Sequence, residues 1–144
     1  MEGLRNTDED SGNDSHQIPN PWQEYKTVSE AAKATGISFS APEKFEKYTV
    51  SYVQAMDGIV EVTYSDGSNE ICVRKGNGTD DISGDYNVYK NVSEKEIGGN
   101  TVTLKGNGDG VSSAIWTDGK YSYSIYSGNE LANGFAEMLI AEIG

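Results

Sequence analysis

The chain has 144 residues and a formal net charge of -12, from 11 lysine and arginine residues against 23 aspartate and glutamate residues. This length accommodates one globular domain and a tail. The negative charge argues against nucleic acid and anionic membrane surfaces as partners. No apolar stretch is long enough to span a bilayer, so we expect no membrane insertion by this chain as given. With one cysteine and one histidine, the chain has too few of these residues for an internal disulfide framework, a cysteine-based zinc site or most catalytic triads.

Residues 1–20 contain five acidic residues, one arginine and few aliphatic side chains. This composition predicts a disordered acidic tether, because too little apolar surface is present to offset the entropy of ordering. Asn20 precedes Pro21, which disfavours helix at that point and predicts an extended entry into the domain. We therefore expect a tether over residues 1–20 and a single domain over residues 21–144.

Residues 28–35 are predicted to form a short helix. Thr27 and Glu30 have the spacing of a capping box, in which each side chain satisfies a free backbone N–H of the first turn. Gly36 is a suitable left-handed stop. The helix offers only small apolar side chains for burial, so it needs the rest of the domain to stabilise it.

From Tyr48 onward, apolar and polar residues alternate with a period of two, which is typical of strands. Asp-Gly pairs at residues 57–58, 66–67 and 118–119 favour tight hairpin turns. The predicted strands are residues 48–56, 59–65, 68–75, 87–97, 101–105, 111–117 and 120–126. Since hairpins join nearly all of them, we expect a mainly antiparallel, curved sheet of about seven strands.

Residues 129–143 are predicted to form a C-terminal amphipathic helix that packs on the sheet. Its apolar residues recur near the helical period at Leu131, Phe135, Met138, Leu139 and Ile143. Gly134 weakens the pattern without removing it. The predicted fold class is therefore α+β.

Four segments resemble a family of bacterial domains of unknown function that is common in Firmicutes. They are residues 20–25 (NPWQEY), 82–87 (ISGDYN), 102–106 (VTLKG) and 114–125 (AIWTDGKYSYSI). Members of that family occur in secreted or lipid-anchored proteins, and as the outer C-terminal domain of membrane proteins that resemble anti-sigma factors. The resemblance implies an extracytoplasmic location, secreted or anchored at the cell envelope. It implies no established activity.

Asp81, Ser83 and Asp85 are a candidate calcium site, because oxygen ligands at alternate positions resemble the start of an EF-hand loop. The match ends at Tyr86, where the loop needs glycine, and at Val92, where it needs glutamate. The favoured interpretation is a turn whose side chains bind neighbouring amides.

Nine tyrosines and two tryptophans offer either core packing or an aromatic binding surface. Tyr52, Tyr64, Tyr121 and Tyr123 share strand faces with apolar residues, so core packing is favoured for most rings. Trp116 is expected in the core. The candidate ligand contacts, expected nearer loops or on the opposite face, are Tyr86, Tyr89 and Tyr126.

Catalysis has little support in the sequence. Cys72 has no histidine partner within the predicted domain, which favours a passive thiol. Glu61 and Glu70 lie on adjacent predicted strands, so a pair of carboxylates is one alternative, although accidental pairs are expected in so acidic a chain. We expect no cofactor and no enzymatic activity.

The leading hypothesis is a non-catalytic extracytoplasmic module that binds or senses a protein, peptide or cell-envelope component. We expect it to be a monomer. One alternative is a small carboxylate-based hydrolase of glycan or wall material, which requires an acid with a raised pKa. Another is a calcium-stabilised adhesion or structural domain that uses the loop around Asp81, Ser83 and Asp85.

Overall fold

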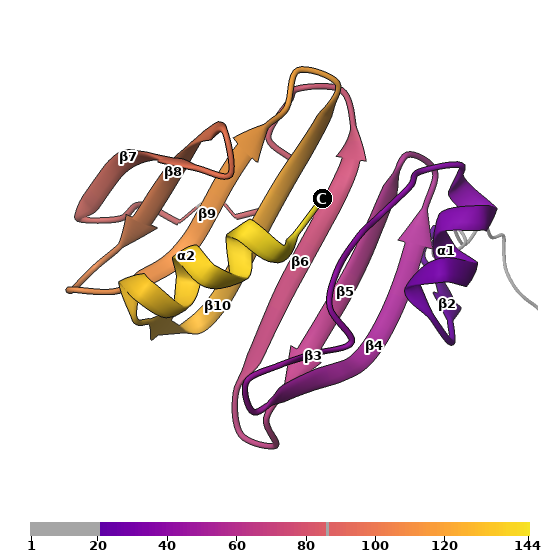
Figure 1. Ribbon diagram of the computed structural model, residues 1–144, viewed down its shortest axis with the longest axis horizontal. Coiled ribbons are helices and arrows are strands. Elements are labelled where there is room, and N and C mark those ends of the chain that lie inside the picture. The colour runs from indigo at the N-terminus through magenta and orange to yellow at the C-terminus, as the bar shows by residue number, and fades with distance from the viewer. Residues whose placement is uncertain (1–20, 86) are drawn as a thin grey trace, which may run out of the picture.

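The computed structural model describes residues 21–85 and 87–144, so the predicted tether and Tyr86 lie outside the described residues. The fold is α+β, as predicted, with one antiparallel sheet and two helices (Figure 1). The helices are α1 (Val28–Thr35) and α2 (Asn133–Glu142). The strands are β2 (Gln23–Tyr25), β3 (Lys44–Phe45), β4 (Tyr48–Met56), β5 (Ile59–Ser65), β6 (Glu70–Asn77), β7 (Asn91–Ile97), β8 (Asn100–Gly106), β9 (Val111–Thr117) and β10 (Tyr121–Leu131).

The sheet is open and its strands follow the order β2-β4-β5-β6-β10-β9-β8-β7, with β3 paired to β4. All seven predicted strands are present. The described residues add β2 and β3, which are too short to show a period of two. The chain leaves β6, crosses to the far edge to form β7, and returns through three hairpin-linked strands until β10 pairs with β6. We call residues 78–85 and 87–90 the crossover.

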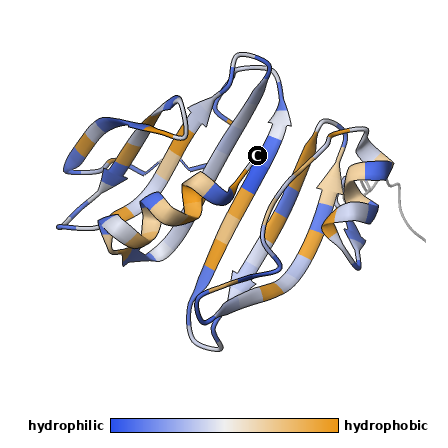
Figure 2. Ribbon diagram, in the orientation of Figure 1, coloured by the Kyte–Doolittle hydropathy of each residue, from blue (hydrophilic) through white to orange (hydrophobic). Residues whose placement is uncertain are grey.

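The two faces of the sheet differ in polarity. On the inner face, Val62, Val73 and Ile125 lie side by side on three neighbouring strands and are each at most 2 % exposed. Orange and blue segments alternate along the central strands in Figure 2, which is the alternation expected for a sheet with one buried face. The outer face carries the polar members of each strand, including Glu61 and Arg74.

Helix α2 and a strap, residues 37–43, cover the inner face (Figure 1). Lys75 is 5 % exposed and donates from Nζ to the Ser38 carbonyl at 2.5 Å, and the Tyr64 hydroxyl donates to the Pro42 carbonyl at 2.6 Å. Backbone hydrogen bonds in both directions join Ser40 and Gly144. The buried side chains of Lys75 and Tyr64 and the backbone of Gly144 therefore hold the strap against the sheet.

Helix α1 has the predicted bounds, and its caps match the sequence. The Thr27 hydroxyl accepts from the Glu30 N–H at 3.1 Å, while the Glu30 carboxylate accepts from the Lys26 N–H at 3.2 Å. Gly36 ends the helix in the left-handed conformation with φ 75°. The capping residues alone were thus enough to predict where α1 begins and ends.

Helix α2 begins later than predicted, because the start of the predicted segment belongs to β10. Leu131 still pairs with Val111. This residue therefore belongs to the sheet, although the helical period had assigned it to the helix. Ala136, Leu139 and Ile140 are the buried residues of α2. Met138 was expected on that face, but it is 57 % exposed.

A β-bulge in β4 corrects the predicted alternation of that strand. Val50 pairs with Tyr64 and Tyr52 pairs with Thr63, so one extra residue, Ser51, lies between the two pairs. A bulge changes the face to which the following side chains point. Tyr52 is therefore 39 % exposed on the outer face and does not pack in the core.

The glycine-rich loop between β8 and β9 holds a carboxylate of β10. Glu130 accepts from the N–H groups of Asn107, Gly108 and Gly110 at 2.6 to 3.3 Å. A Cβ on Gly108 would lie 2.8 Å from the Glu130 carboxylate, and one on Gly110 would lie 2.5 Å from the Leu131 carbonyl. Position 110 thus requires glycine for close approach to the backbone, whereas at position 108 only the Glu130 side chain would have to move.

Trp116 is 7 % exposed, as expected for a core residue, and its ring stacks on Tyr123 with centroids 5.1 Å apart. Trp116→Ala should lower the free energy of unfolding by about 3–5 kcal/mol, because it leaves a large cavity and removes the stacked pair. Urea unfolding followed by circular dichroism measures this change. Trp116→Phe should retain a substantial part of the stability, and equal losses in both variants would contradict the stacking argument.

Candidate functional site

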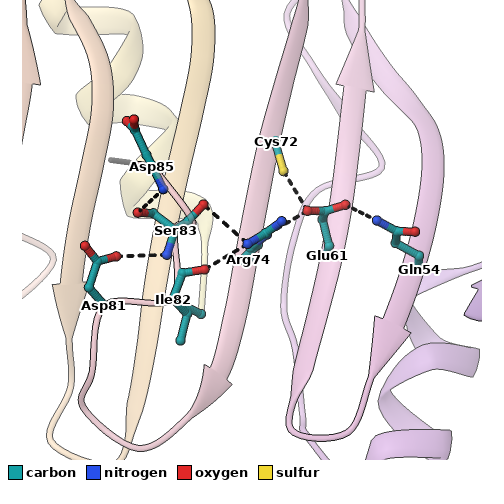
Figure 3. A network of polar contacts seen from close by, with 8 residues as sticks. All are labelled: Gln54, Glu61, Cys72, Arg74, Asp81, Ile82, Ser83 and Asp85. Carbon is teal, nitrogen blue, oxygen red and sulfur yellow. Dashed lines mark hydrogen bonds and ion pairs between the residues drawn. The ribbon is translucent and has the colours of Figure 1, made fainter. Parts of the chain in front are cut away.

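A polar network centred on Glu61 occupies the outer face of β4, β5 and β6 (Figure 3). Glu61 is 5 % exposed, and its carboxylate accepts three hydrogen bonds. The donors are Gln54 Nε2 at 2.5 Å, Arg74 Nε at 2.6 Å and Cys72 Sγ at 3.1 Å. The buried carboxylate of Glu61 is thus paired with a cation and also accepts hydrogen bonds from two neutral donors. These interactions offset the free-energy cost of removing the charge from water.

Strand register assembles this network. β5 and β6 pair so that Glu61 lies opposite Arg74, and β4 and β5 pair so that Gln54 lies opposite Glu61. The register does not support the alternative of a carboxylate pair between Glu61 and Glu70, because Glu70 lies opposite Ser65 at the other end of the strand. The turn between β5 and β6 fixes this register, and a sequence alone does not state which residues face each other across it.

The surroundings of Glu61 and Cys72 move their pKa values in opposite directions. Burial by itself raises the pKa of Glu61, but the bonds from Cys72, Arg74 and Gln54 together outweigh burial and lower it. Burial, with the nearby charge of Glu61, raises the pKa of Cys72 to about 12. Glu61 is therefore ionised and Cys72 is a protonated thiol at neutral pH.

Arg74 connects the network to the crossover. Its Nη1 donates to the carbonyls of Ile82 at 3.0 Å and Ser83 at 3.3 Å. Its guanidinium also lies 5.3 Å from the ring centroid of Trp22, at the start of the described chain. One arginine therefore ties together β5, β6, the N-terminal segment and the crossover.

The residues predicted as calcium ligands form consecutive turns within the crossover (Figure 3). Asp81 accepts from the Ser83 N–H at 2.8 Å, the Ser83 hydroxyl accepts from the Asp85 N–H at 3.1 Å, and Asp85 accepts from the Asn87 N–H at 3.0 Å. In residues 21–85 and 87–144, no three His, Cys, Asp or Glu side chains form a group that could hold a metal ion. The bonds match the turn interpretation, and calcium binding at this loop stays a prediction.

Two of the three predicted ligand contacts lie beside this loop. The Tyr89 hydroxyl donates to Asp85 Oδ2, and burial together with this carboxylate raises the pKa of Tyr89 to about 12. Tyr126 is 36 % exposed on the outer face of β10 and lies near enough to Tyr89 to affect its pKa. The structure thus brings Asp85, Tyr89 and Tyr126 together.

Two adjoining hollows meet at Tyr126 and Cys72, and we call them together the Tyr126 groove. One has a volume of about 730 Å³ and runs toward the β5–β6 turn. The other has a volume of about 470 Å³ and runs along the crossover past Arg74 and Asp85. The first hollow is lined by Thr63, Ser65, Gly67, Ser68, Asn69, Glu70, Cys72, Tyr126, Gly128 and Asn129.

The chemistry of this lining is polar and largely uncharged. Hydroxyl and amide side chains predominate in the first hollow, and Glu70 is its one charged side chain. Asn129 donates from Nδ2 to Asn69 Oδ1, which joins the end of β10 to the β5–β6 turn across the groove. Tyr126 supplies an aromatic face between the two hollows. Such a surface suits contact with a ligand that carries amide or hydroxyl groups.

No family model matches this chain, and neither a curated protein nor a solved structure matches it. Among the described residues, neither α1 nor α2 has the length and apolar composition needed to cross a membrane.

Sequence reasoning missed Gln54, Glu61 and Arg74 as members of one network. Each lies on a strand that the sequence predicted, but their meeting depends on register. A partial signal existed in Glu61 itself, a charged residue within the apolar run IVEVTY, because a buried charge needs a partner.

Glu61→Gln should lower the free energy of unfolding at pH 7 by about 2–4 kcal/mol, because Arg74 loses its ionised partner. The pKa of Glu61 is lower in the folded state than in the unfolded state, so its contribution is present above the unfolded value and is lost as pH falls through the folded value. Urea unfolding from pH 7 to pH 3 should show a shallower loss of stability in Glu61→Gln than in the wild type.

Glu70→Gln is the matched control, since Glu70 is exposed on the neighbouring strand. It should change stability by less than about 0.5 kcal/mol. If Glu61→Gln and Glu70→Gln behave alike, the network around Glu61 contributes nothing to stability.

Cys72 should react slowly with iodoacetamide at pH 8 in the folded protein, because its pKa is raised to about 12 and the thiolate is the reactive form. Intact-mass spectrometry measures the alkylated fraction over time, with a urea-unfolded sample as the control. Equal rates in the folded and unfolded protein would contradict the raised pKa.

Proposed function

We propose that this protein is a non-catalytic extracytoplasmic module that binds or senses a polar peptide or cell-envelope component in the Tyr126 groove. The observation that supports this proposal best is the groove itself. An exposed tyrosine lies there between a hollow lined mainly by hydroxyl and amide side chains and a second hollow that also contains Arg74 and Asp85. An extracytoplasmic location is part of the proposal and rests on the family resemblance of the sequence.

The groove has a fixed framework, which supports a role in recognition. The Glu61 network holds β5, β6 and the crossover together directly beneath and beside it. Preorganised walls reduce the entropy lost when a ligand binds. The net charge of -12 disfavours a strongly anionic ligand and favours a neutral or cationic one.

The hydrolase alternative receives less support from the carboxyl groups. A general acid needs a pKa raised toward neutrality. Where surroundings clearly shift the pKa of a described carboxyl group, the direction is downward in every case: Glu61, Asp66, Asp85, Asp118 and Glu130. These groups are suited to accepting hydrogen bonds, which supports a binding role.

The test is a titration of the isotopically labelled protein, followed by amide NMR, with soluble peptidoglycan fragments, neutral oligosaccharides and short polar peptides. A ligand of the groove should shift the amides of Asn69, Gly84 and Gly128, and Tyr126→Ala should weaken binding by about tenfold, because the aromatic face is lost.

Tyr52→Ala is the matched control, because Tyr52 is a second tyrosine of the outer face with similar exposure, 39 % against 36 %. It should leave the affinity unchanged. Binding that shifts other residues, equal losses in both variants, or no binding by any of the three ligand classes would overturn the proposed function.

A further inference from the structure

The strand β7 forms one edge of the sheet, and it is exposed along nearly its whole length. Residues Asn91 to Glu96 are all exposed, and Val92 is 60 % exposed. In the described part of the chain, β7 pairs with β8 on one side and with no strand on the other. An edge of this kind presents unpaired backbone donors and acceptors that another strand is able to join.

The hairpin geometry identifies which backbone groups face outward. Gly98 and Gly99 both have positive φ, 62° and 87°, and form a two-residue turn flanked by the pair Ile97 and Asn100. In such a hairpin the flanking pair exchanges hydrogen bonds, and every second residue along the strand does the same. The N–H and C=O groups of the intervening residues therefore point away from the sheet: Val92, Glu94 and Glu96.

The side chains of these three residues share the outer face. Lys95, between two of them, reaches the inner face, where its Nζ lies 2.9 Å from Glu137 of α2. Because side chains alternate along a strand, Glu94 and Glu96 point to the opposite face. The free edge thus combines outward backbone groups with an apolar residue followed by two carboxylates on one face.

Charge determines which partner this edge accepts. In the antiparallel pair in which two copies of β7 overlap fully with their outer faces on the same side, Glu94 lies opposite Glu94 of the other copy. Like charges directly opposite each other are destabilising, so this pairing with a second copy is disfavoured. A strand with lysine or arginine at alternate positions places a cation opposite each carboxylate, and the net charge of -12 attracts it.

We propose that the free edge of β7 binds an extended, basic segment of another protein, which adds to the sheet as an antiparallel strand. Main-chain hydrogen bonds to Val92, Glu94 and Glu96 provide the binding, and the side chains select the sequence. The partner carries cations opposite Glu96 and Glu94 and an apolar residue opposite Val92. This surface is separate from the Tyr126 groove and goes beyond the function proposed for it.

The charges also protect the edge against uncontrolled pairing, which is a common role of charged residues on edge strands. The two roles agree, since a face with two carboxylates repels copies of itself and admits only an oppositely charged strand. A purely protective role predicts no binding of any peptide, so one experiment separates the two.

The probe is an end-blocked peptide with the pattern Thr-Lys-Thr-Lys-Thr-Val-Thr, in which the two lysines and the valine fall on one face. Amide NMR should show shifts for Val92, Glu94 and Glu96, and slower hydrogen exchange at these three amides. A peptide with glutamate in place of both lysines should not bind. Raising the salt concentration should weaken the lysine peptide, because the selecting contacts are exposed charge pairs.

Two variants of equal charge change test the site. Glu94→Lys should weaken the lysine peptide about tenfold, because an attractive cross-strand pair becomes repulsive. Glu142→Lys, at the exposed end of α2, should leave its affinity unchanged. Glu94→Pro removes one outward N–H while leaving the bonds to β8 in place, and it should abolish the slowed exchange. Circular dichroism confirms that each variant is folded.

Tyr126→Ala distinguishes this proposal from the proposed function, because it should affect groove ligands and leave the lysine peptide unchanged. Four results overturn the proposal: no binding of the lysine peptide, equal binding of the glutamate peptide, equal affinities of Glu94→Lys and Glu142→Lys, or exchange protection outside β7. If the groove ligands fail to bind but the lysine peptide binds as expected, the proposed function is overturned and the proposal for β7 is supported.

Discussion

The pairing of β10 with β6 is the constraint on which the rest of this structure depends. It joins two hairpin-built halves into one sheet, and it aligns Ile125 with Val73 and Tyr123 with Lys75. The paired residues lie far apart in the chain, so the pairing requires the loss of much chain entropy before it is formed. The pair carries α2 toward the inner face and places Tyr126 beside Cys72 on the outer face. The groove is lined by residues of both strands, so it depends on this pairing.

The two faces that this pairing creates use polar residues in different ways. On the inner face, Lys75 is buried against the rings of Tyr121 and Tyr123, at 4.4 and 5.3 Å from their centroids, while it holds the strap through Ser38. On the outer face, buried charge is carried by the ion pair of Glu61 and Arg74. Each buried charge is satisfied by specific partners, which favours one arrangement of the strap and one of the crossover.

The sequence predicted most elements but not their meeting points. The caps of α1, the Asp-Gly hairpins and the alternation in β5 and β6 all act between near neighbours, so their signals are readable without tertiary structure. The bulge at Ser51 and the late start of α2 were not readable. In both places, pairing with the neighbouring strand of the same hairpin overrode a local period. The Asp81 turn was anticipated as the alternative to a calcium loop.

By itself the sequence determined an acidic α+β chain built from antiparallel hairpins, a capped short helix and the burial of Tyr64 and Tyr123, although it assigned Tyr52 to the wrong face. Only the tertiary structure decided that Glu61 meets Arg74, that Tyr126 lies in a groove, and that β7 is an edge strand with one open side among residues 21–85 and 87–144. The physical reason is the distance along the chain over which each kind of interaction acts. Turn and capping preferences act over a few residues, whereas register and strand order are set by burial and backbone pairing between distant segments.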